Sequence, residues 1–227
     1  MNTEALRTVA ATYGTPTYIF DVREVEARIR LLRSLLPEDT GLCFAVKANP
    51  FLIPYVADLV DRLEVCSPGE YEICIQEQIA PEKIVVSGVN KTYESMKRIL
   101  SYSKGAGIYT IESEEHAKIL RTLAEKNQMP LSVLIRLSSG NQFGVDAETF
   151  LRLAKEIQES PYLTLAGVHY YAGTQKRQSK LEKELDTLTA FAKTFEEETG
   201  TVLNELEYGA GMKVSYFIND SEKDQRE

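Results

Sequence analysis

Short runs of apolar and β-branched residues alternate along the chain with longer segments in which apolar residues recur every three or four positions. Runs of the first kind predict β-strands, and segments of the second kind predict amphipathic helices. Each expected strand except the last is followed by a helical segment, which is the pattern of βα units in a parallel sheet or barrel. Seven strands are expected, at residues 42–49, 62–67, 83–88, 107–111, 132–137, 165–172 and 205–209.

Several of the helical segments also have acidic residues near their beginnings, where the helix dipole favours negative charge. A further helix precedes the first strand, and residues 15–21 read as an additional extended segment. The expected helices cover residues 22–37, 54–61, 69–78, 93–103, 113–127, 146–160 and 180–200.

The same pattern predicts one domain over residues 1–227 and an unfinished barrel. A closed parallel barrel of this kind has eight strands, whereas an open sheet leaves unpaired backbone groups at both edges. After Met212 the sequence becomes polar and offers no further strand or helix, so we expect a barrel that stops after its seventh strand. Residues 213–227 are expected to be a disordered tail.

The composition of the chain excludes several classes of protein. The chain has 227 residues, of which 43% are hydrophobic, and a formal net charge of -8, so it offers no basic surface for nucleic acid. No apolar run is long enough to cross a bilayer, and the first residues lack the pattern of a signal peptide. Three cysteines without CxxC spacing indicate neither a disulfide framework nor a zinc site, and no other metal cluster emerges. We therefore expect a cytoplasmic protein whose partners are small molecules or proteins.

Lys47 lies in the stretch FAVKANP, at the carboxyl end of the first expected strand. In βα folds, functional side chains gather at these strand ends. One interpretation is a lysine whose ammonium simply extends into solvent. The other is an amine kept dehydrated by residues 43–46, which would lower its pKa and allow Schiff-base formation with a carbonyl.

Two other strand ends have the character of an anion site. Gly209 and Gly211 follow the seventh strand, where missing side chains let backbone N–H groups approach a phosphate. Thr174, after the sixth strand, adds a hydroxyl donor. Each motif alone is commonly just a turn. Taken together with Lys47, they predict a phosphorylated aldehyde as the ligand.

The ordered set FAVKANP, VCSPGEYEI, GVHYYAGTQ and YGAGM resembles the diaminopimelate, ornithine and arginine decarboxylase family, over about residues 14–212. The resemblance implies a pyridoxal 5'-phosphate cofactor. It also implies an α/β fold, a TIM-like (β/α) barrel of the alanine racemase type followed by a carboxyl-terminal β domain. That second domain is expected to be missing here, so the barrel is incomplete.

Residue roles follow from the resemblance, position by position. Lys47 matches the lysine that holds the cofactor as a Schiff base, and Arg136 matches a strand arginine near the cofactor. Glu70 falls in a short acidic motif after the second strand. His169 matches the first histidine of the pattern GxHxHxGSQ, whereas Tyr171 replaces the second, which stacks on the pyridine ring. Tyr171 keeps an aromatic face at this position, but the titratable imidazole of the histidine is lost.

The phosphate-holding positions are matched by Thr174, Gly209, Ala210 and Gly211. Ala210 replaces the middle glycine of a triplet, which its Cβ tolerates only at a negative φ. Gln142 stands where the family often has lysine. The acidic residue that bonds the pyridine nitrogen in the family would lie on the eighth strand, beyond this sequence.

The implied function is pyridoxal-phosphate-dependent decarboxylation of an amino acid, and a diamino acid such as diaminopimelate is expected from the family. Two alternatives stay open, a single-domain carrier of the cofactor and a barrel remnant without activity. If this chain is the whole functional molecule, we expect weak cofactor binding and slow or absent decarboxylation. A homodimer, or a second chain that supplies the missing domain, is the expected partner.

Four residues also have plainer interpretations. His169 could be an interior histidine of the barrel that is held by hydrogen bonds. His116 lies on an expected helix, where we predict a solvated side chain without a role. Arg136 could pair with a carboxylate instead of lying beside a cofactor. Cys66 reads as a small packed hydrophobe.

Overall fold

The computed structural model describes residues 2–140 and 143–214. These residues form two compact units, Met1–Glu64 and Val65–Glu227, which are described separately. Seven strands alternate with helices in the described residues, in the chain order that the hydrophobic pattern predicts. Gln142 and most of the expected tail, residues 215–227, lie outside the described residues. The single domain expected over residues 1–227 stays a prediction.

The first unit begins with two helices that bury no side chain and ends with two short paired strands. α1 (Thr3–Tyr13) and α2 (Val22–Leu35) are capped by the side chains of Asn2 and Asp21. β1 (Cys43–Ala45) and β2 (Arg62–Val65) pair in parallel, with Cys43 opposite Arg62. Between them lie the 3-10 helices η1 (Val46–Ala48) and η2 (Pro50–Leu52) and the short helix α3 (Ile53–Val56).

Two expectations for this unit are wrong in extent. The strand expected at 42–49 ends at Ala45, because the Asn49 side chain accepts a hydrogen bond from Phe51 N at 3.1 Å and Pro50 begins a new turn. The helix expected at 54–61 is reduced to α3. Residues 15–21, expected as an extended segment, belong to no helix or strand and lead to Asp21, the cap of α2.

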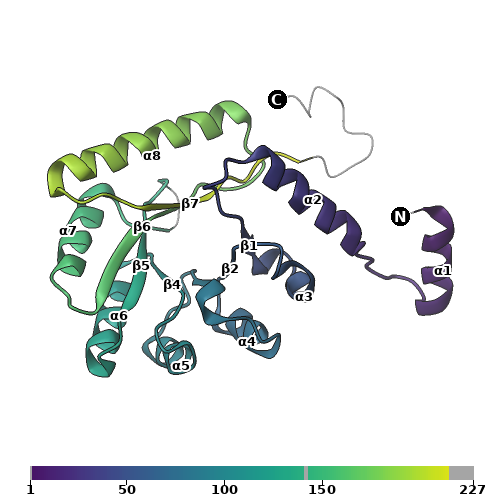
Figure 1. The fold of residues 1–227 in the computed structure, drawn as a ribbon, viewed down its shortest axis with the longest axis horizontal. Coiled ribbons are helices and arrows are strands. Elements are labelled where there is room, and N and C mark those ends of the chain that lie inside the picture. Colours follow the sequence, from purple (N-terminus) through teal and green to yellow (C-terminus); the bar gives the residue numbers. More distant parts are fainter. Residues whose placement is uncertain (1, 141–142, 215–227) are drawn as a thin grey trace. The chain divides into compact units, whose positions relative to one another are not determined.

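The second unit carries five strands in parallel register, and their order in the sheet is their order in the chain. Figure 1 shows them in colours from teal to yellow, with the helices on the outer side of the strands. The strands are β3 (Ile84–Val86), β4 (Ile108–Ile111), β5 (Leu131–Arg136), β6 (Leu163–Tyr171) and β7 (Glu205–Gly209). The intervening elements are α4 (Pro68–Gln76), η3 (Pro81–Lys83), α5 (Tyr93–Ser103), α6 (Glu114–Asn127), α7 (Ala147–Gln158) and α8 (Gln178–Thr199).

Local sequence explains where these helices begin. Ser67, Thr92, Ser113 and Asp146 cap α4, α5, α6 and α7 by accepting a backbone N–H from the first turn. Gly200, at a φ of 68°, ends α8 in the left-handed conformation that glycine adopts without strain. Within the described residues, no helix has the length and apolar character that crossing a bilayer requires.

The strands of this unit present two chemically different faces. Tyr170 of β6 and Tyr208 of β7 stack with their ring centroids 6.3 Å apart, on the face that receives α8. Because side chains alternate along a strand, His169, Tyr171, Glu207 and Gly209 project to the opposite face. Val85, Ile108 and Leu134 form an apolar cluster lower in the sheet. The polar residues of the second face therefore gather toward the carboxyl ends of the strands.

Candidate functional site

Lys47 lies in the 3-10 turn that follows β1, within the first unit. Its side chain is exposed, whereas the preceding Val46 is fully buried. The expectation that burial keeps this amine dehydrated is therefore wrong. The strand ends two residues before Lys47, and the turn directs only Val46 into the interior. The position at the carboxyl end of a strand agrees with the sequence analysis.

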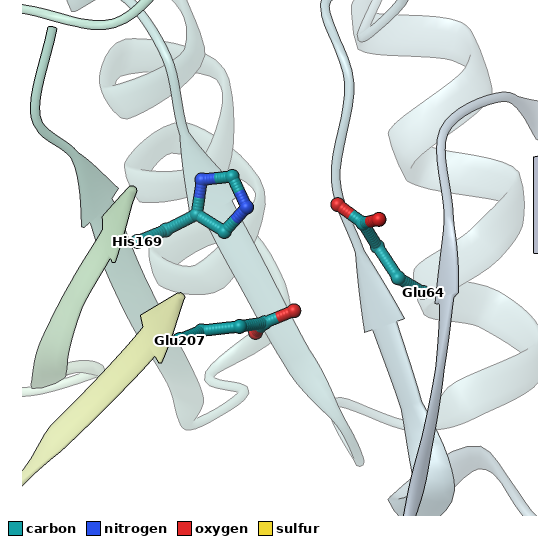
Figure 2. A group of neighbouring side chains, drawn as sticks. All are labelled: Glu64, His169 and Glu207. Atoms are coloured by element: carbon teal, nitrogen blue, oxygen red, sulfur yellow. The ribbon is translucent and has the colours of Figure 1, made fainter. Parts of the chain in front are cut away.

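Three charged or titratable side chains form a row across adjacent strands of the second unit. Arg136 pairs in register with His169, and His169 pairs in register with Glu207. Figure 2 shows His169 and Glu207 extending to the same side of β6 and β7; Glu64, also labelled there, lies on β2. A ring nitrogen of His169 and a carboxylate oxygen of Glu207 lie within 4.8 Å of each other. The row places a cation, an imidazole and a carboxylate on one face.

Arg136 is 8% exposed and is held mainly by aromatic rings. Its guanidinium carbon lies 5.6 Å from the centroid of Phe143 and 5.8 Å from that of Tyr171, within the range of cation–π attraction. Among the described residues, its Nε has no hydrogen-bond acceptor. A buried guanidinium that keeps a donor unused in this way fits an anionic or carbonyl-bearing ligand.

Tyr171 occupies the layer directly above this row, at the carboxyl end of β6. Gly209 is its register partner on β7, and a Cβ on Gly209 would lie 2.6 Å from Cδ2 of the Tyr171 ring. The missing side chain of Gly209 therefore gives the tyrosine ring its space. An aromatic surface beside a buried guanidinium results, as the substitution in the GVHYYAGTQ motif predicts.

The loops after β6 and β7 meet and leave backbone donors available. A Cβ on Gly211, which has a φ of 61°, would lie 2.0 Å from the carbonyl oxygen of Gly173, so only glycine permits this approach. In the described part of the chain, the N–H groups of Gly173, Thr174, Ala210 and Gly211 donate to no protein acceptor. Converging unused N–H groups of this kind form an anion site.

Two finer expectations for these loops can be compared with the structure. Ala210 has a negative φ, because it is not among the described non-glycine residues with positive φ, and its Cβ is tolerated as expected. Thr174, in the same loop, is exposed. The structure thus brings Arg136, His169, Tyr171, Thr174 and residues 209–211 to one end of the second unit.

Glu70 has a structural explanation that the motif alone did not give. Its carboxylate accepts a hydrogen bond from Cys66 N at 2.8 Å, while its own N–H donates to the Ser67 hydroxyl at 3.2 Å. This reciprocal pairing closes the amino-terminal end of α4. Cys66 is half-buried and its Sγ lies 3.4 Å from the Ser87 hydroxyl.

The expectation of a solvated His116 is wrong. His116 is 7% exposed, and its Nδ1 lies 2.9 Å from a carboxylate oxygen of Glu112, which precedes the first turn of α6. Lys91 donates to the same oxygen at 2.7 Å. The helical period correctly predicted α6, but it could not show that this face of the helix turns toward a buried ion pair.

Sequence reasoning also missed two groups near the glycine loop. Glu207 alternates with Glu205 along β7, and this strand pattern could have indicated carboxylates on one face. Lys176 and Glu184 form a buried ion pair with a distance of 2.6 Å. Nothing in the local pattern distinguished these two residues from ordinary solvated charges.

Comparison with known proteins identifies the family to which this chain is related. A family model described as pyridoxal-dependent decarboxylase, pyridoxal binding domain, matches residues 22–227. A diaminopimelate decarboxylase of Actinosynnema pretiosum subsp. auranticum is 31% identical over an alignment of 235 positions, which covers 95% of this chain and 52% of that protein. A diaminopimelate decarboxylase of Pseudomonas aeruginosa is 31% identical over an alignment of 232 positions, which covers 93% of this chain and 55% of the relative. The chain spans about half the length of the curated relatives that it matches.

The solved structures agree with this assignment at the level of the fold. A crystal structure of a protein from Aquifex aeolicus superimposes with a TM-score of 0.83 at 25% identity, covering 95% of this chain and 54% of that one. The likeness confirms the expected fold class, an incomplete (β/α) barrel of the alanine racemase type.

Proposed function

Because the chain belongs to the family of the pyridoxal-binding domain of pyridoxal-dependent decarboxylases, we propose that it holds pyridoxal 5'-phosphate for the decarboxylation of an amino acid. The family assignment confirms the cofactor expected from the ordered motifs. The reaction and its substrate are proposed on the basis of relatives about twice as long as this chain.

This proposal rests on the close approach of the two loops that follow β6 and β7. Gly173 and Thr174 supply backbone N–H groups and one hydroxyl, and Ala210 and Gly211 supply two further N–H groups. A phosphate dianion has the charge and the number of acceptor oxygens that such a set requires. The residues present therefore fit the phosphate end of the cofactor.

Other residues of the second unit fit further parts of the cofactor: Tyr171 provides an aromatic face, and Arg136 provides an unused buried donor. In the first unit, Lys47 is proposed for covalent attachment because it matches the lysine of the FAVKANP motif. His169 adds a second nitrogen donor or acceptor in the row below Tyr171. When bound, pyridoxal phosphate supplies the electron sink that receives the electron pair of the departing carboxylate.

The chain's own contribution to such a reaction is orientation and electrostatics. The loops hold the phosphate, so the ring is fixed at one end. Tyr171 limits the position of the ring from one side, and Arg136 and His169 place donors on the same face of the sheet. Because Tyr171 replaces a histidine, no proton transfer at neutral pH is assigned to that position.

Diaminopimelate is the first substrate to test, since both relatives described above are named diaminopimelate decarboxylase. Ornithine, lysine and arginine are the next candidates.

We propose further that the active species is a homodimer, or this chain together with a second chain that supplies a carboxyl-terminal β domain. We also propose a cytoplasmic location, because the three cysteines are free thiols, which suits a reducing compartment.

The proposed cofactor is tested by measuring whether pyridoxal phosphate becomes covalently attached to Lys47. The chain mixed with pyridoxal phosphate should gain visible absorbance that borohydride fixes covalently, and Lys47→Ala should lose this property completely. Lys83→Ala is a matched control, because it removes a lysine from the turn before β3 instead of the turn after β1. Equal labelling of the Lys47→Ala variant would contradict the proposed attachment.

The reaction is tested separately by measuring amine and carbon dioxide from a panel of diamino acids. Release of lysine from diaminopimelate would support the decarboxylase. Cofactor binding without turnover of any diamino acid, also after addition of a candidate second chain, would favour a cofactor carrier and contradict the proposed reaction.

A further inference from the structure

Lys176 is a buried lysine beside the proposed phosphate loops, and no motif assigns it a role. Its side chain is 2% exposed and lies between β6 and α8, two residues after Thr174. An ammonium group is rarely removed from water unless specific partners compensate for its lost hydration. The partners of Lys176 therefore indicate what the buried charge does.

The ammonium of Lys176 connects α8 with the end of β7. It donates to Glu184 Oε2 at 2.6 Å and to the carbonyl oxygen of Gly209 at 3.4 Å. The hydroxyl of Tyr208 donates a hydrogen bond to the same Glu184 oxygen at 2.7 Å. The centroid of the Tyr208 ring lies 5.1 Å from the ammonium nitrogen of Lys176. Burial alone would raise the pKa of Glu184, but the hydrogen bonds from Lys176 and Tyr208 lower it, so the carboxylate stays ionised.

The backbone of Lys176 binds the other end of the same loop. Its N–H donates to the carbonyl oxygen of Gly211 at 2.9 Å, and its carbonyl accepts the N–H of Lys213 at 3.1 Å. Side chain and backbone together hold residues 209, 211 and 213. One residue thus fixes the glycine loop on both sides of Ala210.

The direction of the Ala210 N–H depends on the first of these contacts. In a trans peptide, the carbonyl of one residue and the N–H of the next point in opposite directions. A hydrogen bond that holds the Gly209 carbonyl toward Lys176 therefore turns the Ala210 N–H away from it. Without that bond, rotation of the Gly209–Ala210 peptide would present a carbonyl oxygen, which repels an anion, where a donor is needed.

We propose that Lys176 is a positioning residue that sets the glycine loop in the conformation that receives a phosphate. Glu184 neutralises its charge, so the effect arises from loop geometry instead of an added positive field. This inference rests on the proposed function, since it names a residue that prepares the same phosphate site. It also predicts that a substitution of Lys176 weakens the binding of the cofactor's phosphate and leaves the binding of its ring unchanged.

The experiment compares the affinities of the 227-residue chain for pyridoxal phosphate and for pyridoxal, which lacks the phosphate. Replacing Lys176 alone would leave Glu184 buried without its partner, so the main variant is Lys176→Met/Glu184→Leu, which replaces the ion pair with apolar groups of similar size. We expect roughly tenfold weaker binding of pyridoxal phosphate, the loss of one charge-assisted contact. Binding of pyridoxal should not change.

The matched control is Lys183→Met, which removes one positive charge from the exposed surface of the same helix. Its affinity for both compounds should equal that of the unmodified chain. An unchanged affinity of the double variant for pyridoxal phosphate, or an equal loss for both compounds, would overturn the positioning role. Failure of the unmodified chain to bind pyridoxal phosphate would overturn the proposed function and, with it, this inference.

A second readout needs no cofactor. The N–H groups of Lys213 and of residue 176 are protected by hydrogen bonds that depend on the loop conformation. In the double variant both amides should exchange with solvent faster than in the chain with Lys183→Met. Unchanged exchange at both positions would contradict the idea that the ion pair holds the loop.

Discussion

Glu112 illustrates, at the scale of single residues, how this protein stabilises a buried charge. Its side chain is 1% exposed, and its carboxylate receives hydrogen bonds from Lys91 and Thr110 and lies 2.9 Å from Nδ1 of His116. Burial alone would raise the pKa of Glu112, but the charge of Lys91 and these hydrogen bonds lower it below its ordinary value. The carboxylate therefore stays charged at neutral pH.

Glu112→Gln should reduce the free energy of unfolding by about 3–5 kcal/mol at pH 7, because it leaves the buried ammonium of Lys91 without a counter-charge. The folded-state pKa of Glu112 lies below the ordinary value of 4.5. Its stabilising contribution is therefore complete above pH 4.5 and is lost as the pH falls through the lower, folded-state pKa. The difference between the unmodified chain and the variant should shrink on acidification, as urea unfolding at several pH values would measure.

Glu115→Gln serves as the control for this measurement, since Glu115 is exposed on the first turn of the same helix. It should change stability by less than about 0.5 kcal/mol. A difference between Glu112→Gln and the unmodified chain that widens below pH 4.5 would be incompatible with a lowered pKa.

At the scale of elements, the stretch between β2 and α4 shows how a family motif serves the start of a helix. Ser67 accepts the N–H of Glu70, Glu70 accepts the N–H of Cys66, and Pro68 occupies the first turn, where its missing N–H costs nothing. The resemblance places Glu70 in a short acidic motif after the second strand. The structure assigns it to the helix cap.

Glu70→Ala should therefore lower the free energy of unfolding by about 1 kcal/mol, the usual cost of losing a capping interaction. Glu70→Gln should cost less, because its amide oxygen can still accept the N–H of Cys66. Chemical denaturation of both variants is the measurement. If the glutamine variant were as unstable as the alanine variant, the charge of Glu70 and not its hydrogen bond would be the important property.

The strands show which element boundaries the hydrophobic pattern can predict. β7 has the expected bounds, 205–209, because a turn signal follows it at once. β1 is much shorter than its apolar run, since the side chain of Asn49 and the ring of Pro50 favour a turn over continued pairing. Apolar character by itself does not determine where a strand stops pairing.

At the scale of the whole molecule, burial is distributed unequally between the two units. In the first unit, α1 and α2 contain no buried residue. In the second unit, every residue of β4 and all but one of β5 are buried. Local opening should need least energy where few apolar contacts are lost.

Native-state hydrogen exchange should therefore be fastest in the amides of α1 and α2 and slowest in β4 and β5. Mass spectrometry of peptides from the exchanged chain would measure this order. Protection of α1 as strong as that of β4 would show that the first unit is covered by something that the chain itself does not provide, such as a second copy.

The amino-acid sequence by itself determined the succession of seven strands with their helices, the family, and the two loops at Thr174 and Gly211. These features rest on periodicity, on local turn chemistry and on an ordered set of motifs, all of which can be read along the chain.

Only the tertiary structure decided the environment of individual charges. It left Lys47 exposed, buried His116 against Glu112, and paired Lys176 with Glu184 beside the glycine loop. Burial and pairing depend on which helix face meets which strand, and that arrangement is set by packing between segments distant in sequence. A charged residue on a solvated helix and one in a buried ion pair therefore look alike in the sequence.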